Sequence, residues 1–353
     1  MKNGNGTGRR RREEKEPGQQ TIAPKKPVSL VTGPTSGIGR LLIKKLLASG
    51  HQVRVLVRSS ETLNSLPPGV IPHVADITLS GGHDDQRRLE EACTGVRYVF
   101  HLAAITNLKR ASLDEFINTN VIGTENVLRA CVDANPAAEH IRFIYLSSTE
   151  VYGKQRQGEI ITEDSELRPT SSYGQTKHMA EEVIRAFEQA HPKIEYTIFR
   201  TSTMYGPYYE GSFNKIFRLI KQQKMKYIGQ GLNHLTLIHV DDVVKGITMS
   251  MDNPRAFDRT YNLTDGKDYT LKLLFEKAAM FLNVPAPSKS IHPTLVKLAS
   301  TISNVNPAEI DFLMSDRIIS IDRITNDIGF KPEKNIDKEG QAMVKEFLAK
   351  YKA

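Results

Sequence analysis

The fold is decided by the stretch Val28-Ser29-Leu30-Val31-Thr32-Gly33-Pro34-Thr35-Ser36-Gly37-Ile38-Gly39-Arg40. An apolar run typical of a strand ends in a glycine-rich turn, and a helical pattern follows from Leu41 to Ser49. In this context Gly33 permits a tight turn, Gly37 lets the backbone approach a pyrophosphate, and the helix N-terminus offers N–H groups and a positive dipole. The spacing Gly-x-x-x-Gly-x-Gly differs from the usual Gly-x-Gly-x-x-Gly, but the strand-turn-helix context still predicts a dinucleotide site.

Strand-like and helix-like segments alternate beyond this stretch. Strands are expected at residues 52–60, 70–74, 97–104 and 141–146, and helices at 84–94, 113–134 and 172–191. This alternation predicts an α/β fold in which helices cover both faces of a parallel sheet. Ligands of such sheets bind beyond the carboxyl ends of the strands.

The strand ends carry candidate cofactor contacts. The second strand ends at Val57-Arg58, where an NAD site would place a carboxylate on the adenosine ribose. Arg58 would instead accept a 2′-phosphate, which favours NADP(H) over NAD(H). Asp76, after the third strand, is a candidate for the adenine edge. The small residues Ala103 and Ala104, after the fourth strand, would let a cofactor lie close.

A tyrosine and a lysine lie one helical turn apart in the predicted helix 172–191. Tyr173 and Lys177 therefore share a face, so the ammonium can lie beside the phenol. A nearby positive charge lowers the phenol pKa from about 10 toward a value useful for acid/base work at neutral pH. The hydroxyls of Ser147 and Ser148 follow the strand 141–146, at the edge of the sheet where ligands bind.

Composition bounds the class of protein. The chain has 353 residues, 39% of them hydrophobic, which is typical of a globular protein with ample core. Residues 1–27 hold eight basic and three acidic side chains, so +5 of the net charge of +8 lies there. We expect a disordered, solvated basic tail rather than one that binds nucleic acid or an anionic surface.

Metal and membrane sites are not expected. Cys93 and Cys131 have no metal-type spacing, and the sequence contains no His-x-x-x-His pair. No apolar run approaches the ~20 residues that span a bilayer, and the N-terminus lacks the apolar core of a signal peptide. A cytoplasmic location is therefore expected.

Eight motifs, in order, give the chain a family resemblance. From about Val28 to its C-terminus it resembles the extended short-chain dehydrogenase/reductases, also called the NAD-dependent epimerase/dehydratase group. The motifs are Thr32-Gly33-x-x-x-Gly37-Ile38-Gly39, Ala75-Asp76, His101-Leu102-Ala103-Ala104, Asn120-Val121-Ile122-Gly123-Thr124, Ser147-Ser148-x-x-Val151-Tyr152-Gly153, Tyr173-x-x-x-Lys177, Tyr205-Gly206-Pro207 and His239-Val240-Asp241-Asp242.

The resemblance implies a domain organisation. A Rossmann-type, doubly wound parallel sheet of about seven strands would carry a smaller C-terminal substrate lobe. Residues 28–205 would form the NAD(P)-binding domain, and residues 206–353 mainly the lobe, with 234–262 returning to the sheet. Homodimerisation through the helices 113–134 and 172–191 is also expected from the resemblance.

The resemblance also implies roles for residues. Tyr173 would be the general acid/base, Lys177 would hold the nicotinamide ribose, and Ser148 would hydrogen-bond the reacting oxygen. Thr149, Glu150 and Thr203 are candidate substrate contacts. Cofactor contacts are expected from Gly33, Ser36, Gly37, Ile38, Gly39, Arg58, Asp76, Ile77, Leu102, Ala103, Ala104, Asn120 and Lys177.

Two branches of the family compete for the substrate. Nucleotide-sugar epimerases and dehydratases often carry an asparagine and an arginine on the diphosphate, at the positions of Thr203 and Leu235 here. A leucine cannot pair with a pyrophosphate, and residues 291–299 and 321–332 look like parts of hydroxysteroid and dihydroflavonol-type reductases. We therefore expect an oxidoreductase that moves a hydride between NADP(H) or NAD(H) and an apolar secondary alcohol or ketone. A nucleotide-sugar 4-epimerase or dehydratase with retained NAD is the alternative.

Two further interpretations concern individual motifs. A non-catalytic dinucleotide-binding scaffold is disfavoured, because Ser148, Tyr173 and Lys177 are all present. The carboxylates of Asp241 and Asp242 are expected to cap a helix that begins near Val243, rather than to act in catalysis.

Overall fold

The computed structural model describes residue 1 and residues 26–106, 111–155, 158–206, 212–296 and 315–351. The basic tail expected at residues 1–27 lies almost entirely outside the described residues. Pro207 of the Tyr-Gly-Pro motif and residues 297–299 of the reductase-like stretch also lie outside them.

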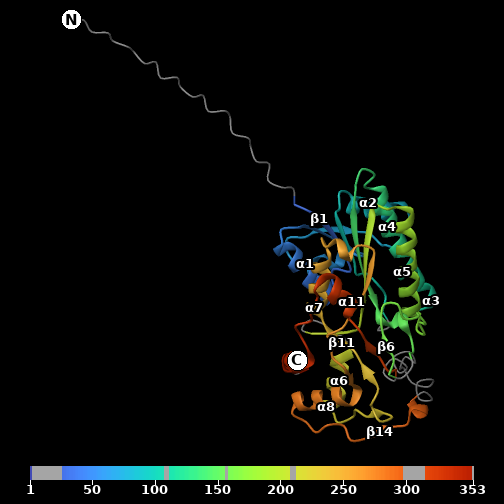
Figure 1. The fold of residues 1–353 in the computed structure, drawn as a ribbon, viewed down its shortest axis with the longest axis vertical. Coiled ribbons are helices and arrows are strands. Elements are labelled where there is room, and N and C mark those ends of the chain that lie inside the picture. Colours follow the sequence, from blue (N-terminus) through green and yellow to red (C-terminus); the bar gives the residue numbers. More distant parts are fainter. Residues whose placement is uncertain (2–25, 107–110, 156–157, 207–211, 297–314, 352–353) are drawn as a thin grey trace.

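A seven-stranded parallel sheet forms the centre of the described chain (Figure 1). The strand order reverses between β1 and β4, so the crevice at their carboxyl ends is the expected ligand site. The predicted α/β class with a doubly wound parallel sheet is confirmed. In spatial order the strands are β3 (Ile71–Val74), β2 (Gln52–Val57), β1 (Val28–Thr32), β4 (Tyr98–His101), β5 (Ile141–Ser148), β7 (Ile194–Thr201) and β12 (Arg259–Leu263).

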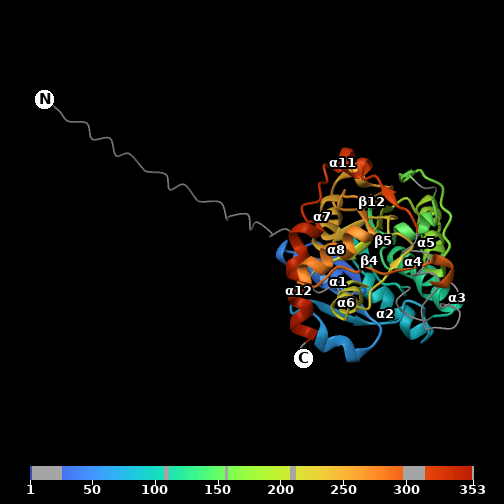
Figure 2. The ribbon, with the colours of Figure 1, turned by 90° about the horizontal axis from the view of Figure 1, so that it is seen from below.

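Helices cover both faces of this sheet (Figures 1 and 2). One face carries α1 (Gly37–Ala48), α7 (Val240–Ser250) and α11 (Asp322–Ile328). The other carries α2 (His83–Cys93), α4 (Gly123–Asp133) and α5 (Ser172–Ala190). A short helix α3 (Leu113–Ile117) joins α4 through one π-helical turn at Asn118–Ile122, where the sequence predicted a single helix.

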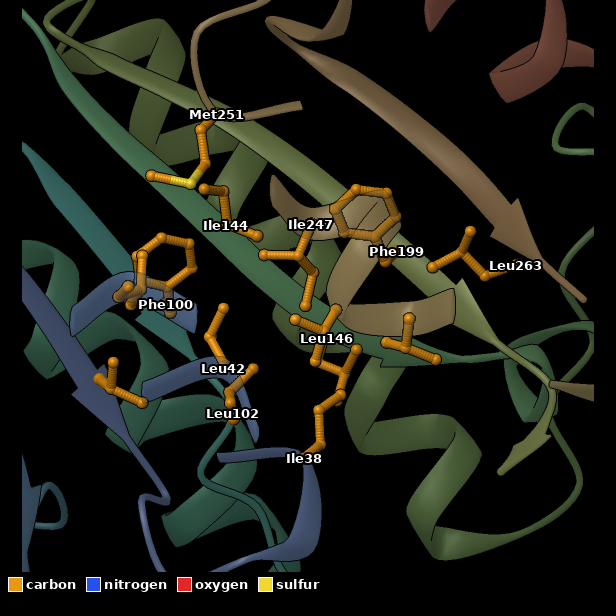
Figure 3. Close-up of a cluster of buried hydrophobic side chains, with 14 of the residues drawn as sticks. Ile38, Leu42, Phe100, Leu102, Ile144, Leu146, Phe199, Ile247, Met251 and Leu263 are labelled. Atoms are coloured by element: carbon orange, nitrogen blue, oxygen red, sulfur yellow. The ribbon is translucent and has the colours of Figure 1, made fainter. Parts of the chain in front are cut away.

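The core under α1 and α7 also positions the site. Ile38 and Leu42 of α1 meet Leu146 of β5 and Ile247 of α7, and all four side chains are at most 8% exposed (Figure 3). Burying each such aliphatic side chain contributes about 1.5–3 kcal/mol. Because Leu146 directly precedes Ser147 and Ser148, this packing fixes the strand end that carries the hydroxyls.

The C-terminal lobe has a separate core. It is formed by α6 (Ser212–Lys221), α8 (Leu271–Leu282) and α12 (Ile336–Tyr351), which pack through Phe217, Phe275 and Phe347. Of the segment 234–262, β12 joins the main sheet, whereas β10 does not. Four two-stranded sheets complete the described structure, pairing β9 (Tyr227–Ile228) with β14 (Ser290–Ile291), β10 (His234–Leu235) with β13 (Tyr269–Thr270), β8 (Thr203–Tyr205) with β11 (Leu237–His239), and β6 (Ile160–Ile161) with β15 (Ile318–Ile319).

Two helix starts differ from the expectation. The first helix begins at Gly37 rather than Leu41, because the Ser36 hydroxyl caps it by accepting from the Gly39 N–H at 3.0 Å. The helix expected near Val243 begins at Val240, and its cap is the imidazole of His239. The carboxylate of Asp242 instead accepts the backbone N–H groups of residues 333 and 334, so it holds a remote segment rather than the helix end.

Candidate active site

The glycine-rich turn lies between β1 and α1, at the carboxyl edge of the sheet. Gly33 has φ +67°, and a Cβ on it would come within 3.0 Å of the backbone nitrogen of Ala103. A Cβ on Gly39 would lie 2.5 Å from the carbonyl oxygen of Gly33. Glycine at these two positions therefore lets the turn pack against both the end of β4 and the first turn of α1.

This turn fits the diphosphate of a dinucleotide. Gly33 and Gly37 are half-buried, whereas Thr35 and Ser36 are exposed. The first turn of the 12-residue helix α1 contains no acidic side chain. An anion can therefore approach this helix N-terminus without meeting a carboxylate from the same helix.

The candidates for the adenosine end lie after β2 and β3. Arg58 is exposed, which leaves it accessible to a phosphate group. The carboxylate of Asp76 accepts the N–H of Thr78 at 2.9 Å, so it is tied into its own turn. Ile77 is buried against Gly123, on which a Cβ would lie 2.8 Å from the isoleucine. Of these candidates, Arg58 has the accessible polar group.

Buried side chains hold the loop after β4, where Leu102 is buried and Ala103 and Ala104 are half-buried. Asn120 is 1% exposed and lies in the π-helical turn. Its amide oxygen accepts the Ile105 N–H at 2.8 Å, and its amide nitrogen donates to the Ile105 carbonyl at 3.0 Å. The same nitrogen donates to Thr176 of α5 at 3.1 Å. In this geometry Asn120 positions the loop against α5.

Tyr173 and Lys177 lie in the first two turns of α5. Tyr173 is half-buried, whereas Lys177 is 2% exposed. The Lys177 Nζ lies 5.9 Å from the centre of the Tyr173 ring. It donates to the carbonyl of Leu146 at 2.6 Å and to the hydroxyl of Tyr145 at 3.1 Å, both on β5. The ammonium is thus held by the sheet beside the phenol.

Burial controls the charge of this lysine. It lowers the pKa of Lys177 to about 7, although the carboxylate of Glu181 opposes the shift. Burial, with the Lys177 charge, also lowers the pKa of His101 to about 3, so this imidazole is neutral. The positive charge beside Tyr173 is therefore full below pH 7 and is lost as the pH rises through about 7.

The turn that carries Ser148 is locked to the start of α5. The Ser148 hydroxyl is nearly buried, at 9% exposed, and accepts the Glu150 N–H at 3.2 Å. The Glu150 carboxylate accepts the hydroxyl of Ser171, the N-cap of α5, at 2.6 Å. A Cβ on Gly174 would lie 2.7 Å from the Glu150 carbonyl oxygen. These contacts hold the turn of Ser148 against the first turn of α5, which carries Tyr173, and make Glu150 an anchor.

A buried ion pair supports this arrangement. Glu181, one turn after Lys177, is 0% exposed and lies 2.7 Å from the guanidinium of Arg200 on β7. It also accepts the Ser147 hydroxyl at 2.6 Å. Burial raises the pKa of Glu181, but Arg200 and Ser147 lower the pKa by a larger amount, so the net shift is downward. The spacing of four along residues 173, 177 and 181 could have identified this residue from the sequence.

The C-terminal lobe and the strand before it hold the residues that were predicted to contact the substrate. Thr203 is half-buried on β8, and Leu235 is 6% exposed within the apolar core of the lobe. The backbone N–H of Arg317 donates to the carbonyl of His234 at 2.9 Å. Burial lowers the pKa of the Arg317 guanidinium to about 10, and the negative charge of Glu150 opposes the shift. An arginine that no motif indicated thus lies within electrostatic reach of the turn that carries Ser148 and Glu150.

The described ranges also bear on metals and membranes. Within them no three His, Cys, Asp or Glu side chains gather to hold a metal ion. The helices described here are too short or too polar to cross a membrane. Cys93 and Cys131 are buried free thiols whose sulfurs lie 3.5 Å apart.

Known proteins resemble this chain in sequence and in fold. A dTDP-glucose 4,6-dehydratase of Streptomyces griseus is 31% identical over 259 residues, which are 69% of this chain and 75% of that relative. An N-acetyl-alpha-D-glucosaminyl-diphospho-ditrans,octacis-undecaprenol 4-epimerase of Escherichia coli O157:H7 is 29% identical over 214 residues, 60% of this chain. That match spans 63% of the relative, under two thirds of its length. A solved short-chain dehydrogenase/reductase superfamily protein from Agrobacterium tumefaciens, with bound NAD, is 25% identical with a TM-score of 0.70 and covers 92% of this chain and 99% of its own.

The family expected from the eight motifs is confirmed by a family model. The model of the NAD dependent epimerase/dehydratase family matches residues 29–264, most of the chain. The matched region contains the glycine-rich turn, Ser148 and the Tyr173-Lys177 pair. This chain therefore belongs to the NAD-dependent epimerase/dehydratase family.

Proposed function

We propose that this protein acts on a sugar carried on a diphosphate, with NAD as its cofactor. Of the two reactions named for its family, epimerisation and dehydration, we propose 4-epimerisation. The observation that carries the proposal is the family match over residues 29–264, together with relatives that are named for such sugars. We therefore prefer the alternative of the sequence analysis to its main interpretation, an apolar alcohol or ketone.

The proposed roles follow from the contacts of the side chains. A bound NAD would supply the acceptor, and then the donor, of the hydride of the sugar carbon. Tyr173 would accept the proton of the sugar hydroxyl as that carbon is oxidised, and give it back on reduction. Lys177 would favour the phenolate, and the Ser148 hydroxyl would hydrogen-bond the reacting oxygen.

Two side chains favour epimerisation over dehydration. Dehydration needs a further acid/base group to remove a proton beside the carbonyl and to expel a hydroxyl. The two side chains that follow Ser148 are the candidates for this acid/base group. Thr149 is only 3% exposed, and the carboxylate of Glu150 is bound to Ser171. A 4-epimerase needs neither group, because it moves one hydride and one proton.

The substrate diphosphate needs a positive charge that Leu235 does not supply. We assign this role to Arg317, because its guanidinium is buried and feels the charge of Glu150, and its backbone is hydrogen-bonded to His234, the neighbour of Leu235. An arginine pairs with a diphosphate through charge-assisted hydrogen bonds. Thr203 remains a proposed contact of the same substrate.

A second candidate has one observation in its favour. Leu235 stands where nucleotide-sugar enzymes of the family often carry an arginine, and its buried side chain offers no charge to a diphosphate, which favours a reductase of an apolar ketone. That enzyme would release its cofactor after each turnover, and the exposed Arg58 would select NADPH. For the epimerase we propose NAD, the cofactor bound in the Agrobacterium tumefaciens structure.

Analysis of the retained cofactor separates the two candidates. The purified protein is denatured, and the released nucleotides are identified by mass spectrometry. We expect one NAD per chain and interconversion of the 4-epimers of a UDP- or dTDP-linked sugar by the native protein. An empty protein that binds NADPH and reduces a steroid or flavonoid ketone would establish the second candidate instead.

Homodimerisation and a cytoplasmic location stay predictions. Ile122 and Met179, on the helical segments named for the dimer, are 40% and 39% exposed and could be covered by a second copy. Sedimentation velocity of the wild type and of Met179→Glu would test this face. A monomeric wild-type protein would contradict the prediction.

A further inference from the structure

A row of polar side chains crosses three neighbouring strands below the site. It consists of Thr32 on β1, His101 on β4 and Tyr145 on β5, and we call it the polar row. The sheet register pairs Thr32 with His101 and His101 with Tyr145. Each of the three is at most 1% exposed, and the His101 and Tyr145 rings stack with centres 5.7 Å apart. Polar groups inside a central sheet are costly unless they are hydrogen-bonded, so their bonds define what the row does.

The protons at the β1 end of the row can be assigned. The Thr32 hydroxyl oxygen accepts the N–H groups of Leu102 and Ala103, both at 3.1 Å. With its lone pairs used, the hydroxyl donates its own proton to the Nδ1 of His101 at 2.8 Å. Because this imidazole is buried and neutral, its remaining proton is on Nε2.

The remaining protons follow from the first assignment. The Nε2–H of His101 donates to the Thr124 hydroxyl at 3.0 Å, and Thr124 donates to the carbonyl of Asn120 at 2.7 Å. Thr124 also contacts the hydroxyl of Tyr145, and this contact lowers the Tyr145 pKa. The Tyr145 oxygen accepts an N–H of the Lys177 ammonium at 3.1 Å.

This chain of bonds ends on the lysine of the catalytic pair. The Nζ of Lys177 donates to Tyr145 at 3.1 Å and to the Leu146 carbonyl at 2.6 Å, and an ammonium has a third hydrogen to offer a ligand. We infer that Tyr145 is a positioning residue, whose hydroxyl, oriented by Thr124 and His101, holds Lys177 as a charged ammonium at the site. The inference deepens the proposed function, because it rests on the role proposed for Lys177.

The other groups that face Lys177 do not replace this bond. Glu181, on the same helix, raises the pKa of Lys177, but its carboxylate is bound by Arg200 and Ser147. His101, on β4, is neutral, and the Tyr173 ring lies 5.9 Å away. Burial nevertheless lowers the lysine pKa to about 7. Loss of an acceptor for the charged form must lower it further, so the positive charge would be lost at a lower pH.

The test is a direct titration of Lys177 in the full-length protein. Lysine labelled with carbon-13 at Cε is followed by NMR against pH, and Lys177→Arg identifies the resonance. The wild-type midpoint is expected near pH 7, apart from ordinary lysines near 10.4. In Tyr145→Phe we expect a midpoint about one pH unit lower, the effect of one hydrogen bond to a charged group.

Tyr261→Phe is the matched control. Tyr261 is also 0% exposed, on β12, and its hydroxyl lies 3.0 Å from two acceptors, the carbonyl of Arg255 and the carboxylate of Asp327, which share its one proton. We expect this deletion of a buried hydroxyl to leave the Lys177 midpoint unchanged. An equal midpoint in Tyr145→Phe and the wild type would overturn the inference.

A second variant covers a failure of Tyr145→Phe to fold. Thr124→Val removes the group that orients the tyrosine hydroxyl without touching Lys177, and we expect a smaller shift in the same direction. An unchanged Lys177 midpoint in Thr124→Val would contradict the role of Thr124 in orienting the Tyr145 hydroxyl. The titration needs no substrate, so inactivity on diphosphate sugars would refute the proposed function and leave this result standing.

Discussion

The proposed cofactor side and the proposed substrate side of the site are built differently. On the cofactor side, Gly33, Ser148 and Lys177 lie at or near the ends of β1 and β5 and in the first turns of α5. On the substrate side, Thr203 and Arg317 come from short strands or loops far apart in the sequence. In the proposed function, one sheet therefore organises the chemistry, and the contacts of a separate lobe would set the specificity.

Tyr173→Phe is expected to have the largest effect and tests the cofactor side. Without the phenol hydroxyl, proton transfer loses its acid/base, so turnover should fall about 10³-fold while retained NAD is unchanged. The rate of nicotinamide reduction at 340 nm after addition of sugar nucleotide measures this. Tyr98→Phe is the control, because Tyr98 is a buried tyrosine at the start of β4, at the opposite edge of the sheet from the site, and this variant should keep the wild-type rate. Turnover above a tenth of wild type in Tyr173→Phe would refute the acid/base assignment.

Arg200→Met tests the ion pair that supports both Ser147 and α5. It leaves the Glu181 carboxylate buried without its closest cation, so we expect a loss of about 3–5 kcal/mol in the free energy of unfolding. The Glu181 pKa is lowered in the folded protein, so the stability that the pair contributes is lost as the pH falls through that pKa. The difference in the free energy of unfolding between the wild type and Arg200→Met should therefore become smaller at acidic pH.

Urea unfolding at several pH values makes this measurement. Arg129→Met is the control, because the pair of Arg129 with Glu125 is 60% and 41% exposed and should contribute less than about 1 kcal/mol. Equal losses in the two variants would contradict a special role for the buried pair.

The difference between the two sides also explains what the sequence could predict. The Tyr173 and Lys177 pair, the glycine turn and the alternation of the sheet depend on local spacing, so they and the family could be read directly. The role inferred for Tyr145 could not be predicted without the strand register, because only its pairing with His101 shows that its hydroxyl belongs to a network. Arg317 needed the lobe fold, because nothing local relates it to the neighbourhood of residue 234.

The expectation for the substrate shows the same limit of local patterns. Leu235 correctly indicated an apolar position, since its side chain is in the core of the lobe. The step from that leucine to an apolar substrate assumed that a motif arginine had no replacement elsewhere. A long-range contact can supply the charge, and sequence spacing carries no information about it.

Gly174→Ala tests the close contact between α5 and the turn of Ser148. The new Cβ would lie 2.7 Å from the Glu150 carbonyl oxygen, so helix and turn must separate, at about 1–3 kcal/mol in stability. Turnover should fall as well, because Ser148 and Tyr173 move apart. Gly246→Ala is a matched helical control whose Cβ meets a flexible Leu263 side chain at 3.3 Å. Normal stability and turnover in Gly174→Ala would show that the close contact between α5 and the turn of Ser148 is not needed.

Arg317→Met is expected to have the smallest effect and is the test of the substrate side. If its guanidinium binds the diphosphate, the KM for the sugar nucleotide should rise about tenfold, while kcat and the retained NAD stay constant. Arg323→Met is the control, because Arg323 lies on α11 and is paired with Asp164. Steady-state kinetics on both variants separate binding from chemistry. An unchanged KM in Arg317→Met would remove the compensation for Leu235, and the apolar ketone would again be the better substrate, because the described lobe would then lack its assigned diphosphate ligand.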